Sequence, residues 1–268
     1  MKEKTTTQRR QFIKKTLVAG ASAMLLPGLL TAETPEATNE ITENITGRAA
    51  EGKDITILFQ GDSITDGNRT RNNDWNHIMG HGYQYILSSS LWYRFPEKNF
   101  HFFNRGVSGN KVTDLAARWK EDTLNLTPDV ISILIGINDV QSVMNDSPDK
   151  VDSINYENEY RALLHQTKER LPSVELILCE PFILPLGHTK DNYQKWLEEI
   201  QKRQASVRTL SKEFDAVYVD FQDVFNDALK RAPVEYWIWD GIHPMPAGHE
   251  LMARQWTKQV HKKLSFIK

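Results

Sequence analysis

The sequence comprises 268 residues with a formal net charge of -2 and 40% hydrophobic side chains. A chain of this length and composition can fold as one large domain or as two small ones. Its nearly balanced charge argues against nucleic acid or an anionic membrane surface as the main partner, because both attract proteins with a strong basic excess.

Residues 1–32 have the pattern of an export signal. Arg9 and Arg10 lie in a basic segment, which is followed by an uncharged, mostly apolar stretch from Thr16 to Leu30 and by a small-residue cleavage site ending at Ala32. This arrangement resembles a bacterial twin-arginine signal peptide. An ordinary Sec signal or a membrane anchor is the alternative, although the apolar stretch is short for a membrane span. We expect the mature protein to be exported, either periplasmic or secreted, with no membrane attachment after removal of the signal.

Residues 33–50 are polar, acidic and without hydrophobic periodicity, which is typical of a disordered linker. The folded domain is therefore predicted to span residues 51–268. Cys179 is the only cysteine, so no intrachain disulfide can form. It lies in the apolar run that begins at Val174, which predicts a buried structural thiol rather than a catalytic one.

Strand-like and helix-like segments alternate from about residue 52 onward. Runs that are apolar at nearly every position suit parallel strands covered on both faces. Helical periodicity is clearest for Tyr160–Leu171 and for Met252–Leu264, which follows Pro246. The alternation predicts one doubly wound α/β sheet, whose ligands bind at the carboxyl ends of the strands. The predicted strands are Ile55–Phe59, Phe100–Asn104, Val130–Ile135, Val174–Cys179 and Ala216–Asp220.

Four short motifs lie at the predicted ends of the first three strands and in a late loop. They are Gly61-Asp62-Ser63, Asn104-Arg105-Gly106-Val107-Ser108-Gly109, Gly136-Ile137-Asn138-Asp139 and Asp240-Gly241-Ile242-His243. In this order they resemble the SGNH (GDSL) hydrolase family, and the resemblance extends over residues 55–260. It implies a three-layer α/β/α fold with a five-stranded parallel, flavodoxin-like sheet, and a serine esterase that needs no metal or organic cofactor. Ser63 is not in a Gly-x-Ser-x-Gly elbow, which disfavours the other large α/β esterase family.

By this resemblance, Ser63 is the nucleophile, His243 the general base and Asp240 the carboxylate that orients the imidazole. The chemistry of these residues supports the same roles, because a serine hydroxyl needs a base and an imidazole acts best when a carboxylate fixes its tautomer. An aspartate three residues before a histidine on a tight turn can reach Nδ1 while Nε2 faces outward. The simpler interpretation of Ser63 is a helix cap, and Ser108 is the competing hydroxyl.

The resemblance also implies an oxyanion hole, formed by the backbone amides of Ser63 and Gly106 and the side-chain amide of Asn138. Glycine suits such a position because the substrate must approach bare backbone closely. Taken alone, Asn138 would be interpreted as a turn residue.

The polar segment 68–82 is long for a strand–helix connection and is expected to lie over Ser63. It contributes Arg69 and Trp75 as candidate substrate-binding residues, and Trp237 and Trp239 precede the Asp240 motif. Aromatic faces beside polar donors suit sugar rings, whereas core packing is the alternative and is expected for at least one of Trp237 and Trp239. The predicted substrate is an acetylated oligo- or polysaccharide, which implies a carbohydrate O-acetylesterase similar to the bacterial acetylxylan esterases of the same family.

Other functions stay open at this point. Lysophospholipase-like, thioesterase-like or other short-chain ester hydrolases belong to the same family. A metallophosphoesterase is the best candidate from a different class, since Gly-Asp, Asn-Asp and late Asp and His residues also build two-metal sites, but the first strand has no Asp-x-His. A non-catalytic glycan-binding protein could use the same scaffold. The sequence leaves the oligomeric state open.

Overall fold

The computed structural model describes residues 54–72, 74, 76–264 and 267. The predicted export signal, the predicted linker and Trp75 lie outside the described residues. The described residues all belong to one unit of the chain, Ala49–Lys268. Within it, no helix of the described part of the chain is long and apolar enough to cross a membrane.

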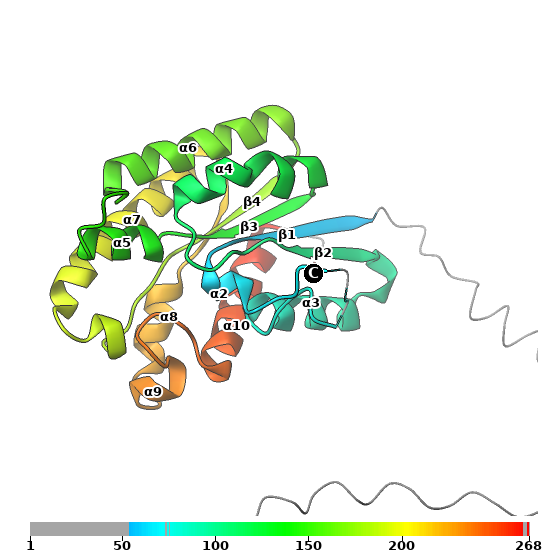
Figure 1. Ribbon diagram of the computed structural model, residues 1–268. Helices are drawn as coiled ribbons and strands as arrows, with labels where there is room; N and C mark the ends of the chain where they lie inside the picture. Colours follow the sequence, from blue (N-terminus) through cyan, green and yellow to red (C-terminus); the bar gives the residue numbers. More distant parts are fainter. Residues whose placement is uncertain (1–53, 73, 75, 265–266, 268) are drawn as a thin grey trace, which may run out of the picture. The chain divides into compact units, whose positions relative to one another are not determined.

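A parallel sheet of five strands lies at the centre of the described residues (Figure 1). Its strand order is β2-β1-β3-β4-β5, the flavodoxin-like order in which the winding direction reverses between β1 and β3. The predicted fold class is therefore confirmed. The strands are β1 (Ile55–Gly61), β2 (Phe100–Asn104), β3 (Val130–Leu134), β4 (Glu175–Cys179) and β5 (Val217–Val219).

Only β2 has its predicted bounds; β3 ends and β4 begins one residue inside the prediction, and β1 and β5 differ by two residues. β1 continues two residues beyond the predicted end, to Gly61, because Gln60 and Gly61 pair with Ile133 and Leu134 of β3. β5 keeps only three of the five predicted residues. It is an edge strand that pairs with β4 alone, through Val217, Tyr218 and Val219. Among the described residues, no second strand forms hydrogen bonds with the residues on either side of this segment, so they are not held in the sheet.

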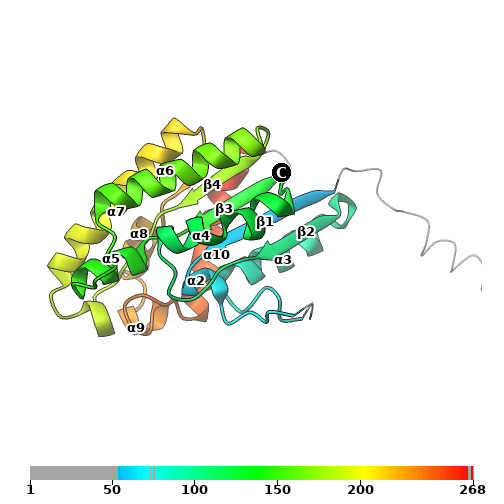
Figure 2. The same ribbon diagram turned by 45° about the horizontal axis from the view of Figure 1, so that its top comes forward.

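Helices cover both faces of this sheet (Figures 1 and 2). One layer contains α3 (Tyr83–Arg94), α8 (Phe221–Ala228) and α10 (Pro246–Lys263), and the other contains α4 (Val112–Asp122), α6 (Ser153–Arg170) and α7 (Tyr193–Glu213). Three short α-helices complete the α-helices of the described residues: α2 (Ser63–Asp66), α5 (Ile137–Met144) and α9 (Val234–Trp237). Three 3-10 helices also occur there: η1 (Pro96–Lys98), η2 (Leu124–Leu126) and η3 (Gly187–Thr189).

The central strand β1 shows why its sequence is apolar throughout. Ile57 and Phe59 pack in the hydrophobic cluster beneath α3 and α10, whereas Leu58, which points to the opposite face, packs beneath α4 and α6. All three side chains are fully buried. Successive residues of a strand point to opposite faces, so a sheet covered by helices on both sides requires apolar residues at consecutive positions.

Three further predictions are confirmed by the described residues. The periodic segment from Tyr160 forms the second half of α6, with Leu171 as the C-cap, and the segment from Met252 lies in α10, which begins at Pro246 and has Leu264 as its C-cap. Cys179 lies at the end of β4, where burial raises the pKa of its thiol to about 12. It is therefore an inert core residue at neutral pH.

The carboxyl ends of β1 and β3 lie so close together that only a glycine fits between them. A Cβ atom at Gly61 would lie 2.3 Å from the carbonyl oxygen of Leu134. The segments that leave β1 and β3 therefore start from adjacent points, and the motifs predicted from the sequence converge there.

Candidate active site

Ser63 is the first residue of α2, and its neighbour Asp62 caps that helix. One carboxylate oxygen of Asp62 accepts a hydrogen bond from the amide of Ile64 at 3.0 Å. The capping role that could have explained a serine at this position thus belongs to the aspartate. The interpretation of Ser63 as a helix cap is wrong, and its hydroxyl is free for another partner.

That partner is His243. The Oγ of Ser63 lies 2.7 Å from the Nε2 of His243, across 180 positions of sequence. On the other side of the ring, Nδ1 lies 2.6 Å from an oxygen of Asp240. The other oxygen of Asp240 accepts hydrogen bonds from the amides of Ile242 and His243, at 2.9 and 2.7 Å. The carboxylate is held by its own turn, and the three side chains form one continuous chain of hydrogen bonds.

Gly241 permits this turn. It has a φ of +93°, and a Cβ atom there would lie 2.1 Å from the carbonyl oxygen of Leu186. Any other residue would clash with this backbone and would be strained at that φ. The close packing fixes the direction of both the Asp240 and the His243 side chains.

The pKa values of Asp240 and His243 move in opposite directions. Burial raises the pKa of Asp240, but the hydrogen bonds from the His243 ring and from the two backbone amides outweigh it, so the net pKa lies below the ordinary value. The hydrogen bond to Asp240 raises the pKa of His243, against the opposing effect of burial, and the charges of Asp240 and Asp62 add to the increase. The pair therefore favours an aspartate anion beside a ring that readily takes up a proton.

The prediction for Gly106 needs a correction. Its amide donates to the side-chain oxygen of Asn104 at 2.9 Å in a buried contact, and a Cβ atom on Gly106 would lie 2.3 Å from the amide nitrogen of Asp66. Gly106 therefore serves the close packing of its loop against α2, and its N–H is already used. Gly109, three residues later, is exposed, has a φ of +85° and has no atom within 4 Å of the Cβ position. Its amide has no hydrogen-bond partner among the described residues.

Asn138 lies at the start of α5, at the end of β3, and is half-buried. Its Nδ2 donates to the carbonyl oxygen of Asn110 at 3.1 Å. One of the two amide hydrogens is thereby fixed, which orients the other. Gly109 follows β2 and Asn138 follows β3, the two strands that flank β1 in the sheet. The sequence analysis named Asn138 as a donor and did not name Gly109.

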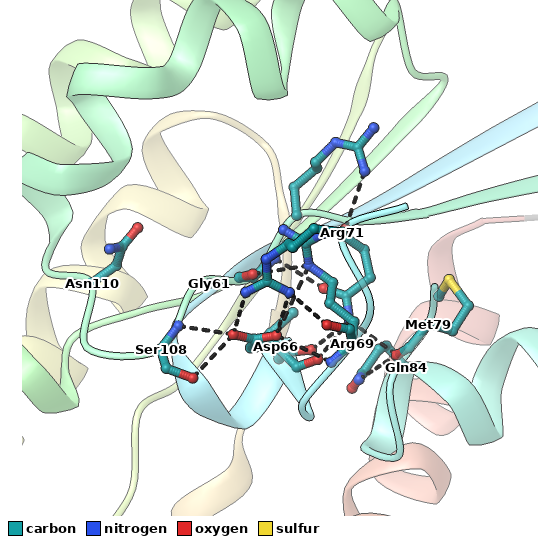
Figure 3. A network of polar contacts seen from close by, with 12 residues as sticks. Gly61, Asp66, Arg69, Arg71, Met79, Gln84, Ser108 and Asn110 are labelled. Atoms are coloured by element: carbon teal, nitrogen blue, oxygen red, sulfur yellow. Dashed lines mark hydrogen bonds and ion pairs between the residues drawn. The ribbon is translucent and has the colours of Figure 1, made fainter. Parts of the chain in front are cut away.

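The competing hydroxyl, Ser108, has a structural partner. Its amide and its Oγ both donate to one oxygen of Asp66, at 3.1 and 3.0 Å (Figure 3). Asp66 is the last residue of α2, so these contacts hold the loop after β2 against the helix that carries Ser63. Ser108 therefore shapes the turn after β2.

Asn104 is a residue that the sequence reasoning missed. Its Nδ2 donates to the carbonyl oxygens of Thr65, Asp66 and Met79, at 2.7, 3.2 and 3.0 Å. It therefore ties the end of β2 to α2 and to the segment after it. The available signal was a polar residue at the end of a buried strand, next to a glycine.

Two buried carboxyl groups, of Asp62 and Asp139, lie within the motifs. Burial raises the pKa of both Asp62 and Asp139 to about 7. One oxygen of Asp139 accepts the amide of Val112 at 3.1 Å. The second oxygen of each carboxyl group has no hydrogen-bond partner among the described residues. These groups favour the neutral form until the pH approaches 7.

A cavity of about 230 Å³ lies over Ser63 and His243. Trp239 lines it, with its ring stacked on that of His243 at a centroid distance of 5.9 Å and with 62% of its surface exposed. Two histidines that the sequence reasoning passed over, His81 and His249, also line the cavity. The amide of Tyr83 donates to Nδ1 of His249 at 3.2 Å, and burial lowers the pKa of that ring to about 4.

The remaining candidate substrate residues lie elsewhere. Trp237 is buried in the core beneath α10, which confirms that at least one of the two tryptophans packs there and corrects its assignment to substrate binding. Arg69 lies outside the cavity over Ser63; its Nε donates to the carbonyl oxygen of Gly106 at 3.1 Å. No cluster of His, Cys, Asp and Glu side chains suited to a metal ion occurs in the described ranges.

Comparison with known proteins agrees with this geometry. Residues 59–251 match the GDSL-like lipase/acylhydrolase family. The chain is 35% identical over 213 residues to an acetylxylan esterase from Geobacillus stearothermophilus, and the aligned region covers 78% of this chain and 95% of that protein. A crystal structure of an acetylxylan esterase from the same organism superposes with a TM-score of 0.70 at 33% identity, over 79% of this chain and 96% of the other.

A third similar structure comes from Parabacteroides merdae and is described as a GDSL-like lipase. It has a TM-score of 0.75 and 41% identity, and the match covers 79% of this chain and 98% of that one. With a family match over most of the folded residues and with similarity over nearly the full length of these relatives, the chain belongs to the GDSL-like lipase/acylhydrolase family and is a carboxylic ester hydrolase.

Proposed function

We propose that this protein is a carbohydrate O-acetylesterase that uses Ser63, His243 and Asp240 as a catalytic triad. The observation that supports the proposal most is the unbroken hydrogen-bond chain from Ser63 Oγ to His243 Nε2 at 2.7 Å and from His243 Nδ1 to Asp240 at 2.6 Å. A serine, a base and an orienting carboxylate in this order are the requirement for acyl transfer through a serine ester.

The reaction then proceeds in two acyl transfers. Ser63 Oγ attacks the carbonyl carbon of the acetyl ester while His243 Nε2 takes the hydroxyl proton. The tetrahedral intermediate collapses, the C–O bond to the sugar breaks, and His243 returns its proton to the leaving sugar oxygen. Water, deprotonated by the same ring, attacks the acetyl-serine, and collapse of the second intermediate releases acetate and restores the Ser63 hydroxyl.

The negative charge on the carbonyl oxygen needs donors in both steps. We assign them as the amides of Ser63 and Gly109 and the Nδ2 of Asn138. Ser63 begins α2, so its N–H is one of those that a helix leaves without an internal partner. The Gly109 amide is free among the described residues, and Asn138 keeps one amide hydrogen beyond its bond to Asn110. Each such donor contributes about 10² to 10³ in rate.

Two features support a small acyl group on a sugar. The cavity over Ser63 encloses about 230 Å³, below the range of about 300 to 1,000 Å³ that is common for ligand pockets, and this disfavours a long acyl chain. Trp239 presents an exposed aromatic face beside His243, where the leaving alcohol must lie. Aromatic faces with polar edges suit a pyranose ring. The similarity to an acetylxylan esterase points in the same direction.

The proposal is tested by measuring acetate release from acetylated xylan, other acetylated glycans and glycerol or lysophospholipid esters of medium chain length. We expect the highest kcat/KM on an acetylated glycan and no effect of chelators. A fluorophosphonate should label Ser63 and abolish turnover. A clear preference for lipid esters would overturn the substrate assignment while leaving the esterase chemistry in place.

A further inference from the structure

A second, larger cavity lies next to the one over Ser63. It encloses about 760 Å³ and is lined by the segment after α2, by the exposed edge of β2 and by the turn that follows β2. Asn68 lines the smaller cavity and Arg69 the larger one, so consecutive residues of the segment after α2 contribute to both. A glycan bound at Ser63 that follows this segment would bring a further sugar ring to the second cavity.

Arg69 is the unusual residue of the cavity. Its side chain is only 8% exposed, and its Nε donates to the carbonyl oxygen of Gly106 at 3.1 Å. Its two terminal nitrogens have no hydrogen-bond partner among the described residues, and the nearest carboxylate contact, from Nε to Asp66, is 4.0 Å. A guanidinium group carries five N–H donors, and a buried one is normally paired with an anion.

The neighbouring carboxylate cannot supply that pair, because its oxygens are already taken. Arg71 donates to both oxygens of Asp66, at 3.0 and 2.7 Å, and Ser108 makes two more contacts with one of them (Figure 3). These hydrogen bonds outweigh the effect of burial and hold the pKa of Asp66 below its ordinary value. Asp66 is therefore a saturated anion that fixes Arg71, and Arg69 reaches it only through Nε at 4.0 Å.

The charge around the cavity is positive overall. Arg105 lies 3.9 Å from Asp122, and that carboxylate also accepts from Arg118 at 2.9 Å. Three guanidinium groups, of Arg69, Arg71 and Arg105, thus line the cavity together with the single carboxylate of Asp122. Burial, together with the charges of Arg71 and Arg105, lowers the pKa of Arg69 to about 10. An anion in the cavity would offset the burial of the Arg69 charge and its repulsion by the neighbouring arginines.

We propose that this cavity binds the carboxylate of an acidic sugar, a uronic acid unit of the acetylated glycan, with Arg69 and Arg105 as its charged partners. This inference rests on the proposed function and adds the class of glycan to it. A carboxylate is planar and matches the fork of an arginine side chain. Phe103 lines the same cavity, and the Arg105 guanidinium lies over its ring at 5.3 Å from the ring centre, which holds that arginine beside the cavity.

The kinetic test compares two acetylated xylooligosaccharides that differ only in one glucuronic acid branch. We expect the wild type to show a higher kcat/KM on the branched substrate. Arg69→Gln and Arg105→Gln should each lower the ratio of the two kcat/KM values by about 10-fold, whereas changes common to both substrates cancel in the ratio. Arg170→Gln, an exposed arginine at the end of α6, should leave the ratio and both kcat/KM values unchanged.

Arg69→Lys distinguishes the effect of the positive charge from that of the guanidinium geometry. A lysine keeps the positive charge and loses the two-pronged geometry, so we expect only part of the preference to return. Arg105, which is 30% exposed at the rim, can be replaced with little risk to folding, so its variant keeps the test decisive if Arg69→Gln does not fold. Equal kcat/KM values on the two substrates in the wild type would overturn the inference.

A binding experiment identifies the anion directly. Isothermal titration calorimetry at constant ionic strength should show glucuronate binding to the wild type, at least 10-fold weaker binding to Arg105→Gln, and no binding of glucose. Binding of inorganic phosphate or sulfate without glucuronate would overturn the acidic sugar and leave a simple anion site. If neutral acetylated xylooligosaccharides are hydrolysed while glucuronate does not bind, the inference fails and the proposed function stands. If glucuronate binds and no sugar acetate is hydrolysed, the proposed function fails instead.

Discussion

The hydroxyl of Ser63 lies 2.7 Å from the Nε2 of His243, although the two residues are 180 positions apart. Ser63 begins the short helix after β1, and His243 lies in the loop before α10. Helix α10 packs against α3 and α8, and this packing brings the loop over the carboxyl end of the sheet. The candidate site therefore depends on the docking of the last helix in the described unit.

Ser63→Ala removes the proposed nucleophile and should lower kcat by about 10⁴ to 10⁶. Steady-state hydrolysis of a chromogenic acetate ester measures the loss, and circular dichroism shows whether the fold is retained. Ser108→Ala is the matched control, because Ser108 is a nearby hydroxyl that bonds to Asp66. It should keep most of the activity. Full activity in the Ser63 variant, with a loss in the Ser108 variant, would transfer the nucleophile to Ser108.

The pH dependence of kcat/KM should have an acidic limb set by His243. The ring must be neutral to accept the Ser63 proton, and its pKa is raised, first by the hydrogen bond to Asp240. Activity should therefore fall, as the pH is lowered, at a higher pH than an unperturbed histidine would give. Asp240→Asn removes that cause, so the limb should move to lower pH, and kcat should fall by about 10⁴ because the ring loses its preferred tautomer. An unchanged limb would show that another group controls it.

The oxyanion assignment predicts a distinct effect for Asn138→Ala. Loss of one donor should lower kcat by about 10² to 10³ with little change in KM, since the contact forms mainly in the transition state. Asn110, which accepts from Asn138 through its backbone, can be replaced by alanine as a control, because its carbonyl group is retained. A variant that raises KM alone would assign Asn138 to ground-state binding.

Alanine substitutions at the two glycines after β2 should have different effects. Gly106→Ala places a Cβ atom 2.3 Å from the amide nitrogen of Asp66 and should lower the free energy of unfolding by about 1 to 3 kcal/mol through overpacking. Gly109→Ala meets no atom within 4 Å, but its φ of +85° disfavours a side chain, so it should disturb the local loop and reduce kcat. Urea unfolding and kinetics on both variants separate the two effects. Loss of kcat with unchanged stability in Gly106→Ala would restore it as a donor.

Trp239→Ala should raise KM for acetylated oligosaccharides several-fold and leave KM for a small acetate ester without a sugar nearly unchanged. The reason is that its exposed ring stacks beside His243, where a sugar ring can contact it. Tyr93→Ala is a suitable control because Tyr93 is 88% exposed on α3, outside the cavity over Ser63. Equal effects on both kinds of ester would contradict sugar binding by this residue.

Most of the sheet could be predicted from the sequence, because the signal for each strand lies in the strand's own residues. Residues such as Ile57, Leu58 and Phe59 are buried on alternate faces, so a strand between two helical layers carries a signal in its own composition. The Asp240–His243 spacing is equally local, because the turn that joins the two residues is fixed by Gly241. Both predictions needed no knowledge of distant contacts.

The predictions that were wrong or incomplete concern residues whose roles depend on tertiary contacts. Gly106 and Gly109 look alike in the sequence, and only the side chain of Asn104 and the backbone of Asp66 determine which of the two amides stays free. Trp237 and Trp239 are two positions apart in one aromatic segment, and the packing of α10 buries the first and leaves the second exposed. His249 was passed over because its partner is the backbone of Tyr83, a residue 166 positions away, rather than a carboxylate.

The cap on α2 has a practical consequence. Because Asp62 holds the first turn of the helix through its bond to Ile64, removal of the Ser63 hydroxyl takes no hydrogen bond away from the backbone. Ser63→Ala should therefore give an inactive protein that keeps the native fold and still binds the glycan. Such a protein could retain an intact ester long enough for crystallography or NMR to record how the glycan sits.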